Sequence, residues 1–267
     1  MRITRERHED RERASHRATV AWAIPLGVVA SLAGCRAEVA EVDGAFYDGD
    51  GRAVHCAINL DDAAGNTVES VDAALDRALE RGEVVELYAH KPGVTVPLAK
   101  LEHVLAAARD RGLAFVTYAD FAAGTDVRPG LALSFDDSGV PNWMSARPLF
   151  QQYGARVTFF VTRYGVFSDD YRAQLRVLAD DGHDIAAHSV AHYRAPSYVE
   201  ENGLQAYLDD EAVPSIEVLR RDGYAVTAFA YPFGARTSEL DDALLAHVPV
   251  LRSVSFSLQG AVSPCPH

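Results

Sequence analysis

The sequence predicts an α/β fold, a distorted (β/α) barrel of about seven parallel strands. Short apolar runs that suit buried strands alternate with segments whose apolar residues recur at helical spacing. Polar side chains suited to chemistry follow directly after several of these runs, and a barrel brings the carboxyl ends of all its strands to one face. A doubly wound sheet uses fewer strand ends at its binding crevice, so the barrel is favoured.

The composition is typical of a soluble globular protein with one large domain. The chain has 267 residues, of which 48% are hydrophobic and 24% are charged. Its formal net charge of −13 argues against nucleic acid or an anionic membrane surface as a partner, because both require basic patches. Neutral and cationic substrates remain open.

The N-terminus has the pattern of an export signal. An Arg-rich stretch is followed by the apolar run from Val20 to Gly34, which at roughly fifteen residues suits a signal peptide and is short for a membrane span. The run ends in Leu-Ala-Gly-Cys, which resembles a bacterial lipobox, so Cys35 is expected to be acylated. The alternatives are a signal peptide without lipid and a buried apolar helix.

We therefore expect residues 1–35 to be a lipoprotein signal peptide, 36–52 a linker and 53–267 the folded domain. This organisation predicts an exported protein of the bacterial cell envelope, attached to the membrane through a lipid anchor. Export implies an oxidising compartment, in which Cys56 and Cys265 can form a disulfide.

The elements follow one another as βα units. Each expected strand is a short apolar run, and each expected helix has an apolar face; the helix over 67–81, for example, stops at Gly82. The expected strands are 53–60, 84–89, 113–118, 131–135, 156–162, 183–187, 225–231 and 250–256, with a possible edge strand at 45–47. The expected helices are 67–81, 97–111, 143–153, 169–181, 198–221 and 237–247.

A strand that ends in two acids is the centre of the chemical prediction. Leu131 to Phe135 runs into Asp136 and Asp137, whose side chains cannot point the same way from a strand end. His188 and His192 are four residues apart after another strand and can face the same way. One carboxylate and two imidazoles form a three-ligand set for a catalytic zinc-like ion with one open position, and the second carboxylate is then available as a general base.

Three motifs of this chain resemble the first three motifs of the polysaccharide deacetylase family, the NodB-homology domains of carbohydrate esterase family 4. They are Ser-Phe-Asp-Asp at 134–137, His-Ser-Val-Ala-His at 188–192 and Phe-Ala-Tyr-Pro-Phe-Gly at 229–234. The resemblance implies a divalent metal, Zn with Co or Ni as alternatives. The roles it implies are general base for Asp136, metal ligands for Asp137, His188 and His192, an oxyanion-holding backbone N–H at Phe233, and a substrate groove lined by Tyr231 and Pro232. Apart from the resemblance, Tyr193 is an aromatic residue near the site that can stack on a sugar ring, with packing as the alternative.

The family's last motifs stand upstream of the first three instead of downstream. The stretch 83–121 resembles the family's C-terminal end, which makes His90 the expected general acid, oriented by Asp61 or Asp62. We therefore predict a circular permutation with motif order 4, 5, 1, 2, 3. A closed barrel allows such a permutation, and it would place strand 250–256 beside strand 53–60.

One departure from the family concerns the arginine that tethers the general base. The aligned position in the third motif is Ala230, and the candidates to replace the arginine are Arg163, Arg194 and Arg236.

The predicted function is metal-dependent removal of acetyl groups from N-acetylated sugars of a cell-envelope or exported polysaccharide. Two alternatives stay open: an O-acetyl carbohydrate esterase that uses the same site, and a non-catalytic envelope lipoprotein that binds glycan. A glycosidase is disfavoured, because adjacent acids do not flank a sugar bond at the required separation.

Overall fold

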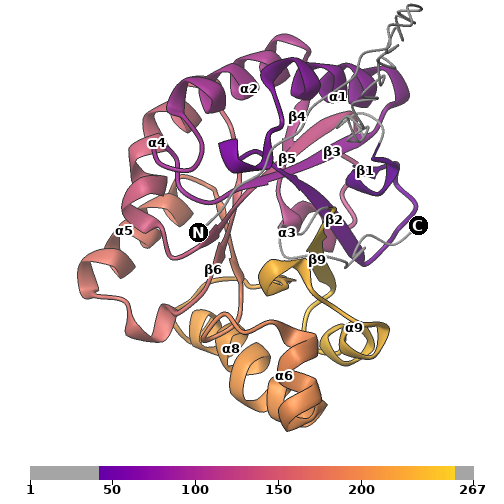
Figure 1. The fold of residues 1–267 in the computed structure, drawn as a ribbon. Coiled ribbons are helices and arrows are strands. Elements are labelled where there is room, and N and C mark those ends of the chain that lie inside the picture. Colours follow the sequence, from indigo (N-terminus) through magenta and orange to yellow (C-terminus); the bar gives the residue numbers. More distant parts are fainter. Residues whose placement is uncertain (1–41, 256–267) are drawn as a thin grey trace, which may run out of the picture. The chain divides into compact units, whose positions relative to one another are not determined.

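The computed structural model describes residues 42–255, and these form a closed barrel (Figure 1). Each barrel strand pairs in parallel with its two neighbours. Around the barrel the order is β2 (Val54–Asn59), β9 (Val250–Val254), β8 (Ala228–Ala230), β7 (Asp184–Ala187), β6 (Thr158–Val161), β5 (Gly130–Asp137) and β3 (Val84–Ala89), which returns to β2. The predicted barrel of about seven parallel strands is confirmed.

The barrel closes through the first and last of its strands in sequence. Residues 54–57 of β2 pair in register with residues 251–254 of β9, so the predicted neighbourhood of these two strands is confirmed. On its other side β2 pairs with β3, through Ile58 opposite Leu87.

Two further strands lie outside the seven. β1 (Phe46–Tyr47) pairs antiparallel with β3. β4 (Ala114–Val116) pairs with residues 130–132 at the N-terminal end of β5, whereas residues 134–137 of β5 pair with β6. Because Ala45 and Phe46 are buried, part of the stretch expected to be a linker packs against the domain.

Helices surround the barrel, as Figure 1 shows. The longer ones are α1 (Val68–Arg81), α2 (Leu98–Asp110), α4 (Val140–Tyr153), α5 (Asp169–Asp180) and α8 (Val213–Arg221). The shorter ones are α3 (Tyr118–Ala122), α6 (Ala195–Asn202), α7 (Leu204–Tyr207) and α9 (Ser238–Leu244). α1 shows how local sequence sets the bounds: the Thr67 side chain accepts a hydrogen bond from the Ser70 N–H, and Gly82 ends the helix in the left-handed conformation.

Two predicted elements differ from the structure. The strand expected to reach Tyr118 stops at Val116, because Thr117 and Asp120 form a capping box that starts α3. The helix expected over 198–221 is interrupted at Gly203, where φ is +91°, and contains a π-helical turn, Leu208–Ala212, between α7 and α8.

Side chains alternate along the strands between two buried environments. On β3, Val85 and Leu87 face the apolar layer under the helices, whereas Glu86 between them points to the barrel interior. Glu86 accepts hydrogen bonds from Tyr118 Oη (2.8 Å) and pairs with His55 Nδ1 (2.9 Å). The barrel interior thus contains polar groups that pair with one another, so a charged side chain can be accommodated there.

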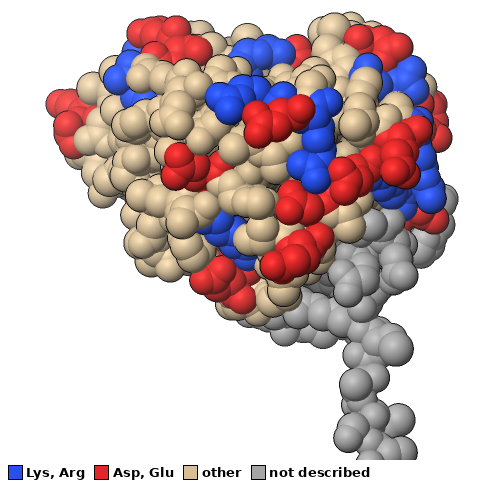
Figure 2. Space-filling view, turned by 90° about the horizontal axis from the view of Figure 1, so that it is seen from above, with Lys and Arg blue, Asp and Glu red and all other residues tan. Residues whose placement is uncertain are grey.

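The surface seen in Figure 2 mixes both signs of charge, with basic side chains beside acidic ones. Arg111 of the α2 C-terminus, for example, pairs with Asp76 of α1 at 2.7 Å. Exposed pairs of this kind contribute little to stability. No helix within residues 42–255 has the length and apolar character needed to cross a membrane.

Gly234 allows a prediction about stability. It has a φ of +65°, and an added Cβ would lie 2.3 Å from Val254 Cγ2 and 2.8 Å from the Val254 backbone nitrogen. We expect Gly234→Ala to combine left-handed strain of about 1 kcal/mol with a clash costing about 1–3 kcal/mol. Thermal unfolding should then begin lower, by about 2–4 °C for each kcal/mol.

Gly154→Ala is the matched control. Gly154 has nearly the same φ, +63°, and open space where its Cβ would lie. Equal melting temperatures for the two variants would contradict the predicted clash.

Candidate active site

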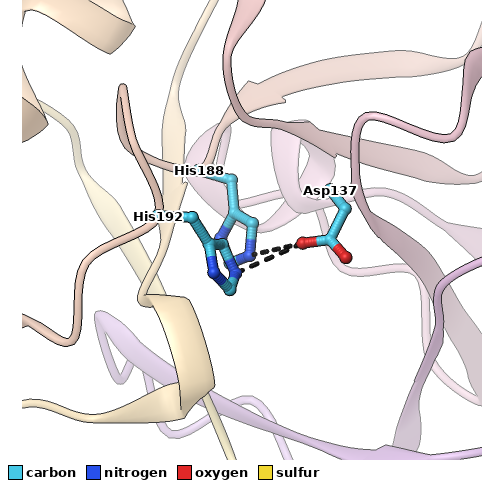
Figure 3. A group of neighbouring side chains, drawn as sticks. All are labelled: Asp137, His188 and His192. Atoms are coloured by element: carbon cyan, nitrogen blue, oxygen red, sulfur yellow. Dashed lines mark ion pairs between the residues drawn. The ribbon is translucent and has the colours of Figure 1, made fainter.

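Asp137, His188 and His192 converge at the carboxyl ends of β5 and β7, as Figure 3 shows. Asp137 Oδ1 lies 3.2 Å from His192 Nε2 and 3.8 Å from His188 Nε2, and one ligand atom from each residue lies within 4.8 Å of the others. Two imidazoles and one carboxylate suit a catalytic zinc-type ion. The residues expected as metal ligands are therefore brought together in a set that fits such an ion.

The two imidazoles are held in the neutral form that a metal requires. His188 Nδ1 donates to the Ala230 carbonyl oxygen at 2.8 Å, which leaves Nε2 as the acceptor that faces Asp137. Burial, reinforced by the proximity of His192, lowers the pKa of His188 well below its usual range. Burial also lowers the pKa of His192.

Left-handed backbone conformations concentrate at this site. Within residues 42–255, the non-glycine residues with positive φ are Asp137, Arg163, Ser189, His192 and Phe233. Asp137 and His192 are expected metal ligands, Ser189 lies between the two histidine ligands in sequence, and Phe233 is the expected oxyanion residue. Such conformations persist only where the surroundings hold them, and they cluster at functional sites.

Asp136 is 3% exposed and pairs with a buried arginine that the motifs did not identify. Arg252 Nη2 lies 2.5 Å from both carboxylate oxygens of Asp136. Arg252 stands on β9 directly opposite Ala230, the position where the tethering arginine was missing. The guanidinium is thus supplied from the neighbouring strand.

The three arginines expected to replace the missing one do not do so. Arg236 bonds Asp241, whereas Arg163 and Arg194 form backbone hydrogen bonds with Val190 and Tyr198. The signal for Arg252 was present in the sequence, because a lone arginine in the apolar run 250–256 must find a buried partner.

Arg252 lies between two aromatic rings. Its guanidinium carbon is 5.0 Å from the Tyr88 ring centre and 4.9 Å from that of Phe160. Among the described residues, its Nε and Nη1 atoms have no hydrogen-bond partner. Burial opposes its charge, but the Asp136 carboxylate outweighs burial and raises the pKa of Arg252. The arginine therefore depends on Asp136 for its charge pairing.

His90 is positioned beside the acidic pair. Ala89 and Phe135 are opposite one another in β3 and β5, so the next residues, His90 and Asp136, occupy neighbouring positions. His90 Nδ1 bonds Asp61, whose other oxygen accepts from the Thr95 hydroxyl at 2.7 Å. Burial lowers the pKa of His90, but the hydrogen bond to Asp61 and the charges of nearby acids outweigh it, so the pKa is raised.

The choice between Asp61 and Asp62 is settled by these contacts. Asp61 orients His90, and the hydrogen bonds from His90 and Thr95 overcome the effect of burial to lower the Asp61 pKa. Asp62 turns outward, with a side chain 63% exposed, and lies 3.4 Å from Lys100 Nζ. The prediction of a role for Asp62 was therefore wrong, because only the first of the two acids points to the histidine.

The third motif forms a tight turn, Pro232–Gly234, against β9. Phe233 is 38% exposed and its ring centre lies 4.7 Å from that of His192. Tyr231 is fully buried with its hydroxyl on Asp241 (2.9 Å), and Pro232 is buried too. These two cannot line an open groove as expected, because they pack under the turn.

Tyr193 is the expected groove residue that remains accessible. It follows His192 and is 53% exposed, so its contact with substrate stays a prediction. Cys35 and Cys265 lie outside the described residues, so lipidation and the disulfide with Cys56 also stay predictions.

Comparison with known proteins points to one family. Residues 123–247 match the family model described as polysaccharide deacetylase. A gellan lyase from Bacillus sp is 31% identical over 124 residues, which are 46% of this chain but 5% of the lyase, so the chain spans only a small part of that relative.

Among solved structures, IcaB from Ammonifex degensii aligns with a TM-score of 0.52 at 20% identity, covering 69% of this chain and 87% of IcaB. The deacetylase PplD of Streptococcus pyogenes aligns with a TM-score of 0.49 at 15% identity, covering 67% and 83%. The IcaB alignment supports the fold. The match to the polysaccharide deacetylase family model spans all three motifs that carry the resemblance in the sequence.

Proposed function

We propose that this protein is a metal-dependent hydrolase that removes acetyl groups from N-acetylated sugars of a cell-envelope or exported polysaccharide. One observation carries the proposal. The candidate metal ligands Asp137, His188 and His192 lie near a buried acid paired with an arginine, Asp136, and near a histidine whose pKa is raised, His90. Acyl hydrolysis needs a metal site, a base and an acid arranged in this way.

The ion held by the three ligands is proposed to be Zn, with Co or Ni as alternatives. When bound, it would polarise the amide carbonyl and make a water molecule more acidic. Two neutral imidazoles and one carboxylate leave one position at such an ion for water or substrate.

The residues around the ligands then divide the proton transfers between them. Asp136, paired with Arg252, takes the proton of the attacking water, and the arginine fixes the direction of the carboxylate. His90, kept protonated by Asp61, donates a proton to the leaving amine. The backbone N–H of Phe233 is proposed to hold the oxyanion.

The location is a separate part of the proposal. The run from Val20 to Gly34 and the lipobox-like Cys35 support export and a lipid anchor. An anchored enzyme of this kind would act on polysaccharide at the cell surface.

Acetate release from N-acetylglucosamine oligomers tests the activity. We expect the protein stripped of metal to release no acetate, and reloading with zinc or cobalt to restore release. Asp137→Asn should stay inactive at the same metal concentration, because it loses the carboxylate ligand. Asp62→Asn, which removes a matched acid that points to solvent, should behave like the wild type.

Two results would contradict the proposal. Stoichiometric metal binding without acetate release from any acetylated sugar would leave a glycan-binding protein. Release from O-acetyl substrates alone, unaffected by His90→Ala, would indicate an esterase, since an ester leaving group needs little help from an acid.

Arg252→Lys tests the positioning of the general base. A lysine keeps the charge but loses the planar guanidinium that contacts the Tyr88 and Phe160 rings and aims Nη2 at both oxygens of Asp136. We expect kcat to fall by about 10- to 100-fold, a part of the 10²–10⁴-fold that acid–base catalysis contributes. Metal affinity should not change. Arg236→Lys is the control, because Arg236 bonds Asp241 instead. Unchanged kcat in a folded Arg252→Lys variant would refute the role.

The pH profile tests His90. Its pKa is raised, so the protonated acid persists to higher pH, and activity falls as pH rises through that pKa. Asp61→Asn removes the carboxylate that favours the protonated form, so the falling limb of kcat against pH should move to lower pH. If the falling limb stays in place in Asp61→Asn, or if Asp62→Asn moves it equally, Asp61 does not determine the pKa of His90.

A further inference from the structure

The loop that carries both histidine ligands is strained. Between His188 and His192 the chain must reverse, and it does so with φ values of +64° at Ser189 and +68° at His192. Such residues are strained and are retained only where neighbouring groups hold them. His188 is fixed by the Ala230 carbonyl, and the carbonyl oxygens of Ser189 and Val190 accept hydrogen bonds from Thr162 Oγ1 and the Arg163 N–H, both at 3.1 Å. The N–H groups of Val190 and Ala191 need acceptors from elsewhere.

One residue far along the chain contacts all three residues between the ligands. Glu211 Oε2 accepts a hydrogen bond from the Ala191 N–H at 2.8 Å, and its backbone oxygen accepts from the Val190 N–H at 3.1 Å. Its carboxylate also interacts with the Ser189 side chain. The Ser189 hydroxyl in turn accepts from the His192 N–H at 3.0 Å, so the contacts reach the second ligand.

Glu211 lies in the π-helical turn Leu208–Ala212 that interrupts the predicted helix. Turns of this kind are rare and occur often at functional sites. The side chain is only 3% exposed, and a buried carboxylate is costly unless hydrogen-bond donors satisfy it. The donors here belong to the ligand loop, so the loop explains why an acid is buried at this place.

We propose that Glu211 is a positioning residue that holds the 188–192 loop in the conformation required for metal binding. Its contacts are with the Val190 and Ala191 N–H groups and the Ser189 side chain, and it acts through these residues of the loop. The inference rests on the proposed metal-dependent function, but its test is separate, because it concerns affinity for metal rather than turnover.

The test uses zinc affinity, measured on the metal-free protein by competition with a chromogenic chelator. Glu211→Gln keeps the size of the side chain but loses one acceptor and the charge. We expect zinc affinity to fall about tenfold or more, within the 10–100-fold range typical of groups that orient metal ligands. Glu211→Ala, which loses every side-chain contact with the loop, should weaken binding further. Excess zinc should restore acetate release by the Gln variant.

The control is Glu217→Gln, an exposed acid on α8 close to Glu211 in sequence. It should bind zinc like the wild type. Thermal unfolding of each metal-free variant separates loop positioning from general stability: the expected result is a loss of affinity in a Gln variant that remains folded.

Each other outcome decides against the proposal. Wild-type zinc affinity in a folded Glu211→Gln variant overturns it, as does a lowered melting temperature with unchanged affinity. If Glu211→Ala does not fold, the Gln variant decides alone. If the wild type itself binds no zinc, the proposed function fails together with this inference, whereas zinc binding and acetate release that do not respond to Glu211→Gln refute only the inference.

Discussion

The buried pair of Asp136 and Arg252 is the interaction on which the site depends. It joins β5 to β9 across the barrel interior, with both oxygens of the acid 2.5 Å from one guanidinium nitrogen. Two charges taken out of water are stable only when each satisfies the other, and removal of either partner leaves an uncompensated charge at a cost of about 3–5 kcal/mol. The pair therefore holds Asp136, the proposed general base, in position. It also couples two strands that are distant in sequence.

The aromatic rings around Arg252 make this coupling stronger. Tyr88 and Phe160 lie against the guanidinium from β3 and β6, so four strands meet at one charge. Cation–π contacts are most favourable where water is excluded, as it is here. Outside the barrel wall the apolar layer under the helices excludes water from the strands, and inside it polar groups pair with one another.

Much of the fold could be predicted because each apolar run is bounded by clear signals. Val84–Ala89 forms the strand as expected, and α1 ends at the expected glycine. The helix expected over 198–221 was harder to predict, because a π turn contains one more residue than an α turn and so shifts the apolar face. Tyr118 was assigned to a strand because the competing capping box depends on Asp120, three residues after the cap.

The proposed metal ligands could be named from the sequence because two short motifs contain them. Arg252 and Glu211 could not be placed, because their partners are distant in sequence. The pairing of β8 with β9 puts Arg252 opposite Ala230, and no local pattern encodes that register. Glu211 looks like any helical acid until the fold brings it to the loop. The prediction that Tyr231 lines the groove was wrong for the opposite reason. Its motif is visible in the sequence, but the fold buries the side chain, and its hydroxyl bonds Asp241.

The closed strand order is compatible with the predicted permutation of the motifs. A permutation requires the first and last barrel strands to be neighbours, and β2 and β9 pair over residues 54–57 and 251–254. With that pairing in place, the site depends on which strands are adjacent and not on where the chain begins. β3 delivers His90 beside Asp136 whether it precedes or follows β5 in sequence. The position of Arg252 follows the same principle. Arg252 reaches Asp136 from β9, and β9 is the neighbour of the strand that carries Ala230.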